Sequence, residues 1–304
     1  MELLDVIVVG GGPAGLTAAT YLQRFHRRCL LIDAGDSRAL RIPESHNCPG
    51  FPDGVSGPEL VARMHTQARE AGVAFESGSV DALTRHEDGG FVVSARSKQW
   101  RSRAVILATG MRDVLPDVAW AEDAIACGAL RLCAVCDAFE ATDLRIGVYG
   151  PRRAVASHGR FLRGYTSRLV LIPTDQAFDA GDDEAFDDGA TQMLAPGGEL
   201  QFDGRRCAYR EPGGTVTELD TLYPYLGVEA EHPLVACAGA GVERPGETVV
   251  DAHQRTRLPG LYAIGDMVSG LNQISVAVGQ AAIAATHLHN ALPFVPRPAP
   301  ASIR

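Results

Sequence analysis

The sequence predicts an α/β protein of two domains, each built around one strand–helix–strand unit. An apolar run at residues 5–9, a glycine-rich turn, a helical stretch and a second apolar run at 29–33 follow one another. Residues 144–175 repeat the order of strand, helix and strand. The chain has 304 residues, which is long enough for two domains.

Charge, hydropathy and cysteine usage narrow the class of protein. A net charge of -9 argues against a nucleic-acid partner, which would favour a basic face. No signal-peptide pattern and no window of membrane-spanning length is found, so we expect no membrane partner and a cytoplasmic location. An odd number of scattered cysteines does not indicate a secreted disulfide framework. They are Cys29, Cys48, Cys127, Cys133, Cys136, Cys207 and Cys237.

The turn after the first strand fits the pattern G-x-G-x-x-G. It consists of Gly10, Gly11, Gly12, Pro13, Ala14 and Gly15. Gly10 allows the tight turn, Gly12 lets the backbone approach a pyrophosphate, and Gly15 lets helix and strand pack closely. Asp33 ends the next strand, where an acid accepts hydrogen bonds from ribose hydroxyls. The pattern therefore predicts a dinucleotide site, with a chance glycine-rich turn as the alternative.

Two later strands end in small residues at the edge where ligands of parallel sheets bind. AVILATG ends in Ala108, Thr109 and Gly110, and GLYAIGD ends in Gly265 and Asp266. With these motifs the chain resembles the flavoprotein disulfide reductases, which have two Rossmann-like dinucleotide-binding domains for FAD and NAD(P). The resemblance implies that Asp266 binds the FAD ribityl chain and that the ATG turn marks the crossover between domains. A plain buried strand remains the alternative for GLYAIGD alone.

The sequence CAVCD places two cysteines three residues apart, followed by an acid. Cys133 and Cys136 are close enough to form a small disulfide ring, and such a motif lowers one thiol pKa. Asp137 is placed to supply or remove a proton during exchange. A zinc site is the main alternative, although no second C-x-x-C pair accompanies it. An inert, buried pair is the other alternative.

The stretch Ser45–Leu60, the segment RLCAVCD and the motif order resemble the low-molecular-weight thioredoxin reductases. The resemblance implies an FAD-binding domain of residues 1–113 and 246–304. It implies an inserted NAD(P)H-binding-like domain of residues 114–245 that carries the disulfide. A homodimer is implied as well, and the expected partner is a thioredoxin-like protein or a small dithiol or disulfide substrate.

The same resemblance assigns roles to single residues. Cys136 would face the flavin C4a atom, Cys133 would be the nucleophile towards the substrate, and Asp137 would be the general acid. Asn47 would lie near the isoalloxazine. Asn272-Gln273-Ile274 occupies the place of an Arg-Gln-Ala flavin contact, of which Gln273 is kept and Ile274 departs. The helix that follows would point its positive N-terminus at the flavin.

The second strand–helix–strand unit departs from the family pattern at its turn, GPRRAV (150–155). Arg152 stands in the place of the second glycine, where the backbone should approach a pyrophosphate. Pro151 removes a backbone N–H that could bind phosphate. Val155 is expected to crowd the contact between helix and strand.

The residues after the next strand depart as well. The family has a His-Arg-Arg run that binds the NADPH 2′-phosphate, and the aligned residues here are Pro173, Thr174 and Asp175. An aspartate repels a phosphate, and the acidic run of residues 175–188 adds to that repulsion. Taken alone, the run is typical of a solvated loop. NADPH use is therefore doubtful.

Together the motifs predict an FAD-dependent thiol/disulfide oxidoreductase that exchanges electrons through Cys133 and Cys136. Its electrons would come from a ferredoxin-type donor or, in the reverse direction, pass from a dithiol to oxygen. Conventional NAD(P)H use is the alternative, with Arg152 and Arg153 contacting phosphate or Asp175 binding the ribose of NADH. A non-catalytic flavin-binding sensor is a further alternative, but the acid beside the cysteines favours an enzyme.

Overall fold

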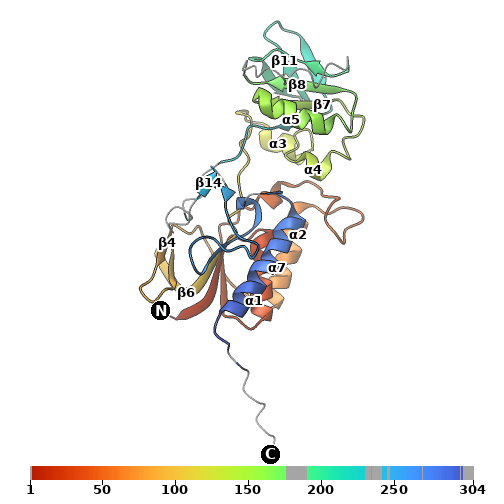
Figure 1. Ribbon diagram of the computed structural model, residues 1–304. Coiled ribbons are helices and arrows are strands. Elements are labelled where there is room, and N and C mark those ends of the chain that lie inside the picture. The colour runs from red at the N-terminus through yellow and green to blue at the C-terminus, as the bar shows by residue number, and fades with distance from the viewer. Residues whose placement is uncertain are drawn as a thin grey trace, which may run out of the picture. The chain divides into compact units, whose positions relative to one another are not determined.

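The computed structural model describes residues 2–175, 190–229, 234, 242–244, 247–268, 270–294 and 296. The chain divides into two compact units (Figure 1). The first unit is Met1–Ser37, Ala62–Gly110 and Glu231–Arg304, and the second is Arg38–Val61 and Met111–Ala230. The predicted domain boundaries at 113/114 and 245/246 stay a prediction. Of the predicted acidic run, residues 176–188 lie outside the described residues.

The first unit contains a seven-stranded sheet of order β3-β2-β1-β6-β5-β4, with β16 also paired to β6. The strands are β1 Leu3–Val9, β2 Cys29–Asp33, β3 Ala74–Ser77, β4 Ala82–Arg85, β5 Phe91–Ala95, β6 Lys98–Leu107 and β16 Leu261–Ala263. The first half of β6 pairs antiparallel with β5, and its second half pairs parallel with β16. Both β1 and β16 run parallel to β6 and end level with Leu107, so their carboxyl ends share one edge.

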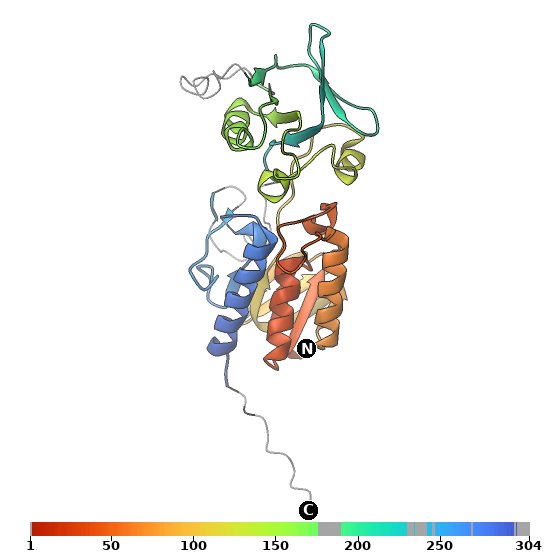
Figure 2. The ribbon, with the colours of Figure 1, turned by 90° about the vertical axis from the view of Figure 1, so that its right-hand side faces the viewer.

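Helices α1 (Pro13–Arg24) and α7 (Ile274–Ala291) lie side by side on one face of this sheet (Figure 2). A proline begins α1, where its missing N–H costs no hydrogen bond. Ala281, Ala284 and Ala285 of α7 are fully buried, and such small side chains let the two helices approach closely. The remaining helical segments of the chain's first third are η1 (Arg38–Arg41) and α2 (Gly57–Glu70).

The second unit contains a four-stranded sheet of order β13-β7-β8-β9 and a three-stranded sheet, β10-β11-β12. The strands are β7 Ile146–Gly150, β8 Leu169–Pro173, β9 Gln192–Met193, β10 Glu199–Phe202, β11 Cys207–Arg210, β12 Val216–Leu219 and β13 Thr221–Pro224. The helices are α3 Ala121–Ala126, α4 Ala134–Asp137 and α5 Arg152–Leu162. The order β7, α5, β8 confirms the predicted second strand–helix–strand unit.

Two short strands, β14 (Val242–Arg244) and β15 (Glu247–Thr248), pair antiparallel. Within the described ranges, every helix is too short or too polar to span a bilayer.

Exchange of Gly15 for alanine tests the close packing at the start of α1. A Cβ at Gly15 would lie 1.9 Å from the carbonyl oxygen of Gly10, so backbone must shift. We expect Gly15→Ala to lower the thermal unfolding midpoint, at a cost of about 1–3 kcal/mol. In Gly279→Ala, the matched control on α7, the new Cβ meets no atom within 4 Å. That variant should keep or raise the midpoint, and equal midpoints for both variants would contradict the assignment.

Candidate active site

The turn between β1 and α1 is built on close backbone approaches. Gly10 has φ +108°, and a Cβ there would lie 2.2 Å from the carbonyl oxygen of Ala108. Gly15 faces the Gly10 carbonyl, as described above. Glycine at these positions therefore allows the β1 turn, the end of β6 and the start of α1 to come together.

The same turn presents backbone to its surroundings and contacts the predicted acid. The Gly11 N–H donates to Oδ1 of Asp33 over 2.9 Å. A Cβ on Gly12 would meet Oγ of Ser37 at 2.9 Å. The residue before α1 is Gly12, which has no side chain that could cap the helix, and a helix N-terminus suits an anionic group.

The three predicted nucleotide motifs meet at the shared carboxyl edge of β1, β6 and β16. Thr109 Oγ1 donates to Sδ of Met267 over 3.4 Å, which joins the ATG turn to η3 (Gly265–Met267). A Cβ on Gly265 would lie 3.0 Å from the Cβ of Ala14, and the Gly265 N–H donates to Gln280 Oε1 over 2.7 Å. Asp266 belongs to η3, and Gln273 caps the start of α7.

These features fit a dinucleotide such as FAD. The fit rests on glycines that bring the turn, the end of β6 and the start of α1 together, on a helix start that follows a glycine, and on acids at two strand ends. The predicted residues Gly10, Gly12, Pro13, Ala14, Gly15, Asp33, Ala108, Thr109, Gly110, Gly265, Asp266, Gln273 and Ile274 all belong to the first unit.

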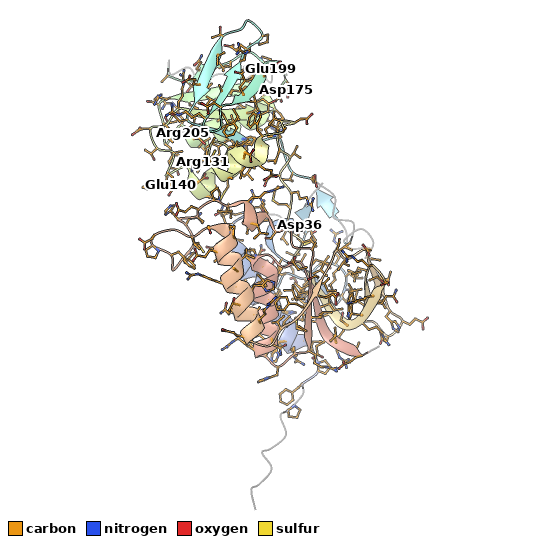
Figure 3. The ribbon with its side chains drawn as sticks, turned by 180° about the vertical axis from the view of Figure 1, so that it is seen from behind. Asp36, Arg131, Glu140, Asp175, Glu199 and Arg205 are labelled. Atoms are coloured by element: carbon orange, nitrogen blue, oxygen red, sulfur yellow. A yellow bond between two sulfur atoms is a disulfide. The ribbon has the colours of Figure 1, made fainter. Side chains whose placement is uncertain are left out.

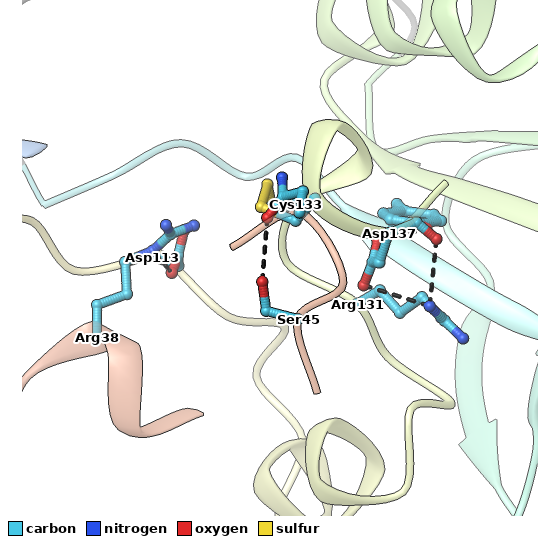
Figure 4. Close-up of a disulfide and its surroundings, with 9 residues drawn as sticks. Arg38, Ser45, Asp113, Arg131, Cys133 and Asp137 are labelled. Carbon is cyan, nitrogen blue, oxygen red and sulfur yellow. Dashed lines mark hydrogen bonds and ion pairs between the residues drawn. A yellow bond between two sulfur atoms is a disulfide. The ribbon is translucent and has the colours of Figure 1, made fainter. Parts of the chain in front are cut away.

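The cysteine pair lies in the second unit as a disulfide (Figure 4). The Cα atoms of Cys133 and Cys136 are 5.3 Å apart, and Cys133 is the residue before the four-residue helix α4. The Cys136 N–H donates to the Cys133 carbonyl over 3.0 Å. Both cysteines are partly exposed, which disfavours the alternative of an inert, buried pair.

Asp137 ends α4 and is held by two other side chains. The Tyr223 hydroxyl donates to Oδ1 over 2.8 Å, and Nη1 of Arg131 lies 3.3 Å from Oδ2. Burial raises the pKa of Asp137, and the hydrogen bond from Tyr223 and the charge of Arg131 offset this only in part. The carboxyl group therefore keeps a proton at higher pH than an ordinary aspartate does, as a general acid requires.

A second tyrosine, the residue that follows β13, contacts the other end of α4. The Tyr225 hydroxyl accepts a hydrogen bond from the Ala134 N–H, and burial raises the pKa of this phenol. Its ring stacks on His158 of α5, with centroids 3.4 Å apart. A Cβ on Gly150 would lie 2.4 Å from the Tyr225 carbonyl oxygen, so the single remaining glycine of GPRRAV is required by this contact.

The turn of the second strand–helix–strand unit, GPRRAV, is hydrogen-bonded to an aspartate of its own unit. The Arg152 N–H donates to Oδ1 of Asp175 over 3.1 Å. Val155, predicted to crowd the contact of helix and strand, is fully buried in the core between α5 and its sheet. Asp175, Arg131 and Glu140 all belong to the second unit. Asp175 lies towards one end of this unit, and Arg131 and Glu140 lie towards the opposite end (Figure 3).

Asn47 belongs to the second unit, as the disulfide does, whereas the other predicted cofactor residues belong to the first unit. Its Oδ1 accepts a hydrogen bond from the Ser45 hydroxyl over 3.0 Å (Figure 4). Arg38 and Asp113 form a two-point ion pair in the same unit, at 2.7 and 3.0 Å.

Sequence reasoning missed Arg131, Tyr223, Tyr225 and His158. The sequence YPY carried a signal, since alternate residues of a strand share one face. The pattern predicts that the two tyrosines share a face, but it does not predict that this face contacts α4.

Alkylation at pH 8, read by mass spectrometry, separates the redox pair from the other described cysteines. Burial raises the pKa of both Cys29 and Cys207 to about 12, so these thiols should stay unmodified in the folded protein. Exposed Cys127 should react at once. Mild reduction should add label at Cys133 and Cys136 only. Label on Cys29 before them would contradict the assignment.

Comparisons with known proteins agree with this architecture. Thioredoxin reductase of Listeria monocytogenes is 29% identical over 296 residues, which are 93% of this chain and 92% of the relative. Thioredoxin reductase of Streptomyces coelicolor is 27% identical over 283 residues, covering 88% and 87%.

Solved structures show the same fold. The thioredoxin reductase of Streptococcus pyogenes superposes with a TM-score of 0.87 at 25% identity and covers 95% of this chain and 97% of that one. HlmI superposes with a TM-score of 0.88 at 25% identity, covering 94% and 92%. The predicted α/β fold and the resemblance to low-molecular-weight thioredoxin reductases are confirmed.

A family match decides the classification. Residues 4–156 and 199–281 match the pyridine nucleotide-disulphide oxidoreductases, and this match includes the glycine turn, the disulfide and Asp266. The chain belongs to the pyridine nucleotide-disulphide oxidoreductase family, as a thioredoxin-reductase-like enzyme.

Proposed function

We propose that this chain is an FAD-dependent thiol/disulfide oxidoreductase that exchanges electrons between FAD and a dithiol or disulfide substrate without conventional use of NADPH. The observation that carries the proposal is the partly exposed Cys133–Cys136 disulfide, with Asp137 next in sequence and a raised carboxyl pKa. A disulfide, an accessible sulfur and a proton donor are the groups that thiol exchange requires.

The first unit would hold FAD, which supplies a two-electron carrier when bound. Gly12 and the start of α1 suit the pyrophosphate, and Asp33 suits a ribose. Asp266 would hold the ribityl chain, as the family resemblance implies. Gln273, at the start of α7, would face the flavin with the positive end of that helix.

The redox unit performs the exchange with its own side chains. A substrate thiolate attacks Sγ of Cys133, the Sγ–Sγ bond breaks, and Cys136 leaves as a thiolate. The Asp137 carboxyl group is placed to give that thiolate a proton. The second thiol of the substrate then displaces Cys133, which leaves an oxidised substrate and a reduced pair, and the reverse sequence reduces a substrate disulfide.

Contacts within the second unit support an electron donor other than NADPH. The Asp175 carboxylate lies at the turn, where it accepts the Arg152 N–H over 3.1 Å, and its charge repels phosphate. Tyr225 and His158 stack at the end of β13. A ferredoxin-type carrier would then donate electrons or, in the opposite direction, oxygen would accept electrons that a dithiol supplies.

Several finer points of the proposal rest on the relatives. Their names support a thioredoxin-like protein as partner, and a small dithiol or disulfide is the alternative substrate. Val135 and Phe139, 51% and 79% exposed, flank Cys136 and offer apolar surface to such a partner. By the same resemblance we propose a cytoplasmic homodimer, with FAD held by residues 1–113 and 246–304.

One observation favours a second candidate, conventional use of NAD(P)H. The hydrogen bond from Arg152 to Asp175 resembles that from Gly11 to Asp33 in the first unit, over 3.1 and 2.9 Å. An acid at such a strand end suits the ribose of NADH. For the sensor alternative, a partly buried acid beside the disulfide has no evident use.

Anaerobic reduction of the bound flavin distinguishes these candidates. The purified protein should be yellow, and NADPH, NADH, dithionite-reduced ferredoxin and a dithiol are compared side by side in a stopped-flow spectrometer. We expect the dithiol or ferredoxin to bleach the flavin and micromolar NADPH to do so slowly or not at all. Rapid bleaching by NADPH would contradict the altered entry, and a protein without flavin would contradict the whole proposal.

A further inference from the structure

The side chain that lies against the proposed general acid comes from a distant strand. We propose that Tyr223 is a positioning residue for Asp137, whose phenol fixes the carboxyl group beside the redox pair and sets the pH range in which it delivers its proton. This inference rests on the proposed function, because it takes Asp137 as the acid of thiol exchange.

The position of the Tyr223 hydroxyl is fixed by packing. The ring is fully buried in a core that also contains Ala134, the first residue of α4, and Ala138, the residue after α4. With the ring held there, the hydroxyl reaches Oδ1 of Asp137 at 2.8 Å. A buried hydroxyl needs a partner, so Tyr223 and Asp137 satisfy each other.

Helix α4 needs such an external contact. It has four residues, which is a single turn, and a helix of this length is not stable alone. Asp137 is its last residue, where fraying would move the carboxyl group first. The bond to Tyr223 at this end and that to Tyr225 at Ala134 attach both ends of the helix to β13 and the residue after it.

The charged and titratable groups around Asp137 come from three segments. Arg131, before α4, and Tyr223, on β13, favour the carboxylate, whereas burial and Glu140, after α4, favour the protonated form. Tyr225, stacked on His158 of α5, lies near enough for its own titration to respond to Asp137. Loss of the Tyr223 hydroxyl removes a stabiliser of the carboxylate, so the pKa of Asp137 should rise.

The test is the pH dependence of disulfide opening by dithiothreitol, followed under anaerobic conditions. Dithiothreitol loses two electrons and becomes the cyclic disulfide, while Cys133 and Cys136 become thiols. The new thiols are trapped by alkylation and counted by mass spectrometry, so the readout does not depend on flavin turnover. Each rate is divided by the thiolate fraction of dithiothreitol, which leaves the protonation of the protein as the variable.

In the wild-type protein the corrected rate should fall as pH rises through the pKa of Asp137, because the acid form is lost. In Tyr223→Phe, which keeps the buried ring, the fall should occur about one pH unit higher, the size expected for one hydrogen bond to a charged group. Tyr209→Phe is the matched control. Tyr209 is equally buried, but its hydroxyl donates to the Ala195 carbonyl, away from the disulfide, and its profile should match the wild type.

Two further variants keep the test decisive. Asp137→Asn should remove the inflection from the profile of corrected rate against pH. The double variant Asp137→Asn, Tyr223→Phe should then have the same profile as Asp137→Asn alone. Replacement of Tyr223 by 3-fluorotyrosine keeps the hydroxyl as a stronger donor, so the inflection should move to lower pH. This variant serves if Tyr223→Phe does not fold.

The outcomes separate the inference from the proposed function. If the wild type shows the inflection, Asp137→Asn abolishes it and Tyr223→Phe leaves it in place, Tyr223 is not a positioning residue although the proposed exchange stands. If dithiothreitol does not open the wild-type disulfide at any pH, both the exchange and the inference are wrong. An equal shift in Tyr209→Phe would assign the effect to general destabilisation and overturn the inference.

Discussion

The redox half of the molecule depends on the attachment of α4 to the end of β13. A single helical turn cannot hold two cysteines and an acid in a fixed arrangement by itself, because forming the first turn orders several residues for one hydrogen bond. Tyr223 and Tyr225 provide this order from outside, one hydroxyl at each end of the turn. Tyr223 belongs to β13 and Tyr225 follows it directly, so the end of one strand supplies both contacts.

The two strand–helix–strand units share one architecture but differ in the contacts at their turns. In the first, Gly15 allows α1 to lie against the Gly10 carbonyl, and a glycine without a capping side chain precedes the helix. In the second, Val155 fills the corresponding contact as part of the core. The carbonyl of Tyr225 takes the space beside Gly150. The second unit thereby becomes a support for the disulfide, under our proposal.

The sequence allowed prediction of what depends on local order. Glycine spacing, apolar strands and the C-x-x-C pair predict the fold, the glycine turn with Asp33, and the disulfide, since each pattern lies within a short stretch or one strand–helix–strand unit. The partner of Asp137 could not be predicted, because Tyr223 is 86 residues away in sequence. For the same reason the raised pKa of Asp137 was not foreseen, as it follows from burial that only the packed structure defines.

The central claim is that the cysteine pair and a bound flavin form one electron-exchanging system. The direct measurement is an anaerobic titration with dithionite, in which the electrons taken up before the flavin is fully bleached are counted. We expect about four electrons per chain for the wild type, two for the flavin and two for the disulfide, and about two for Cys133→Ser. Equal uptake by the wild type and Cys133→Ser would contradict it.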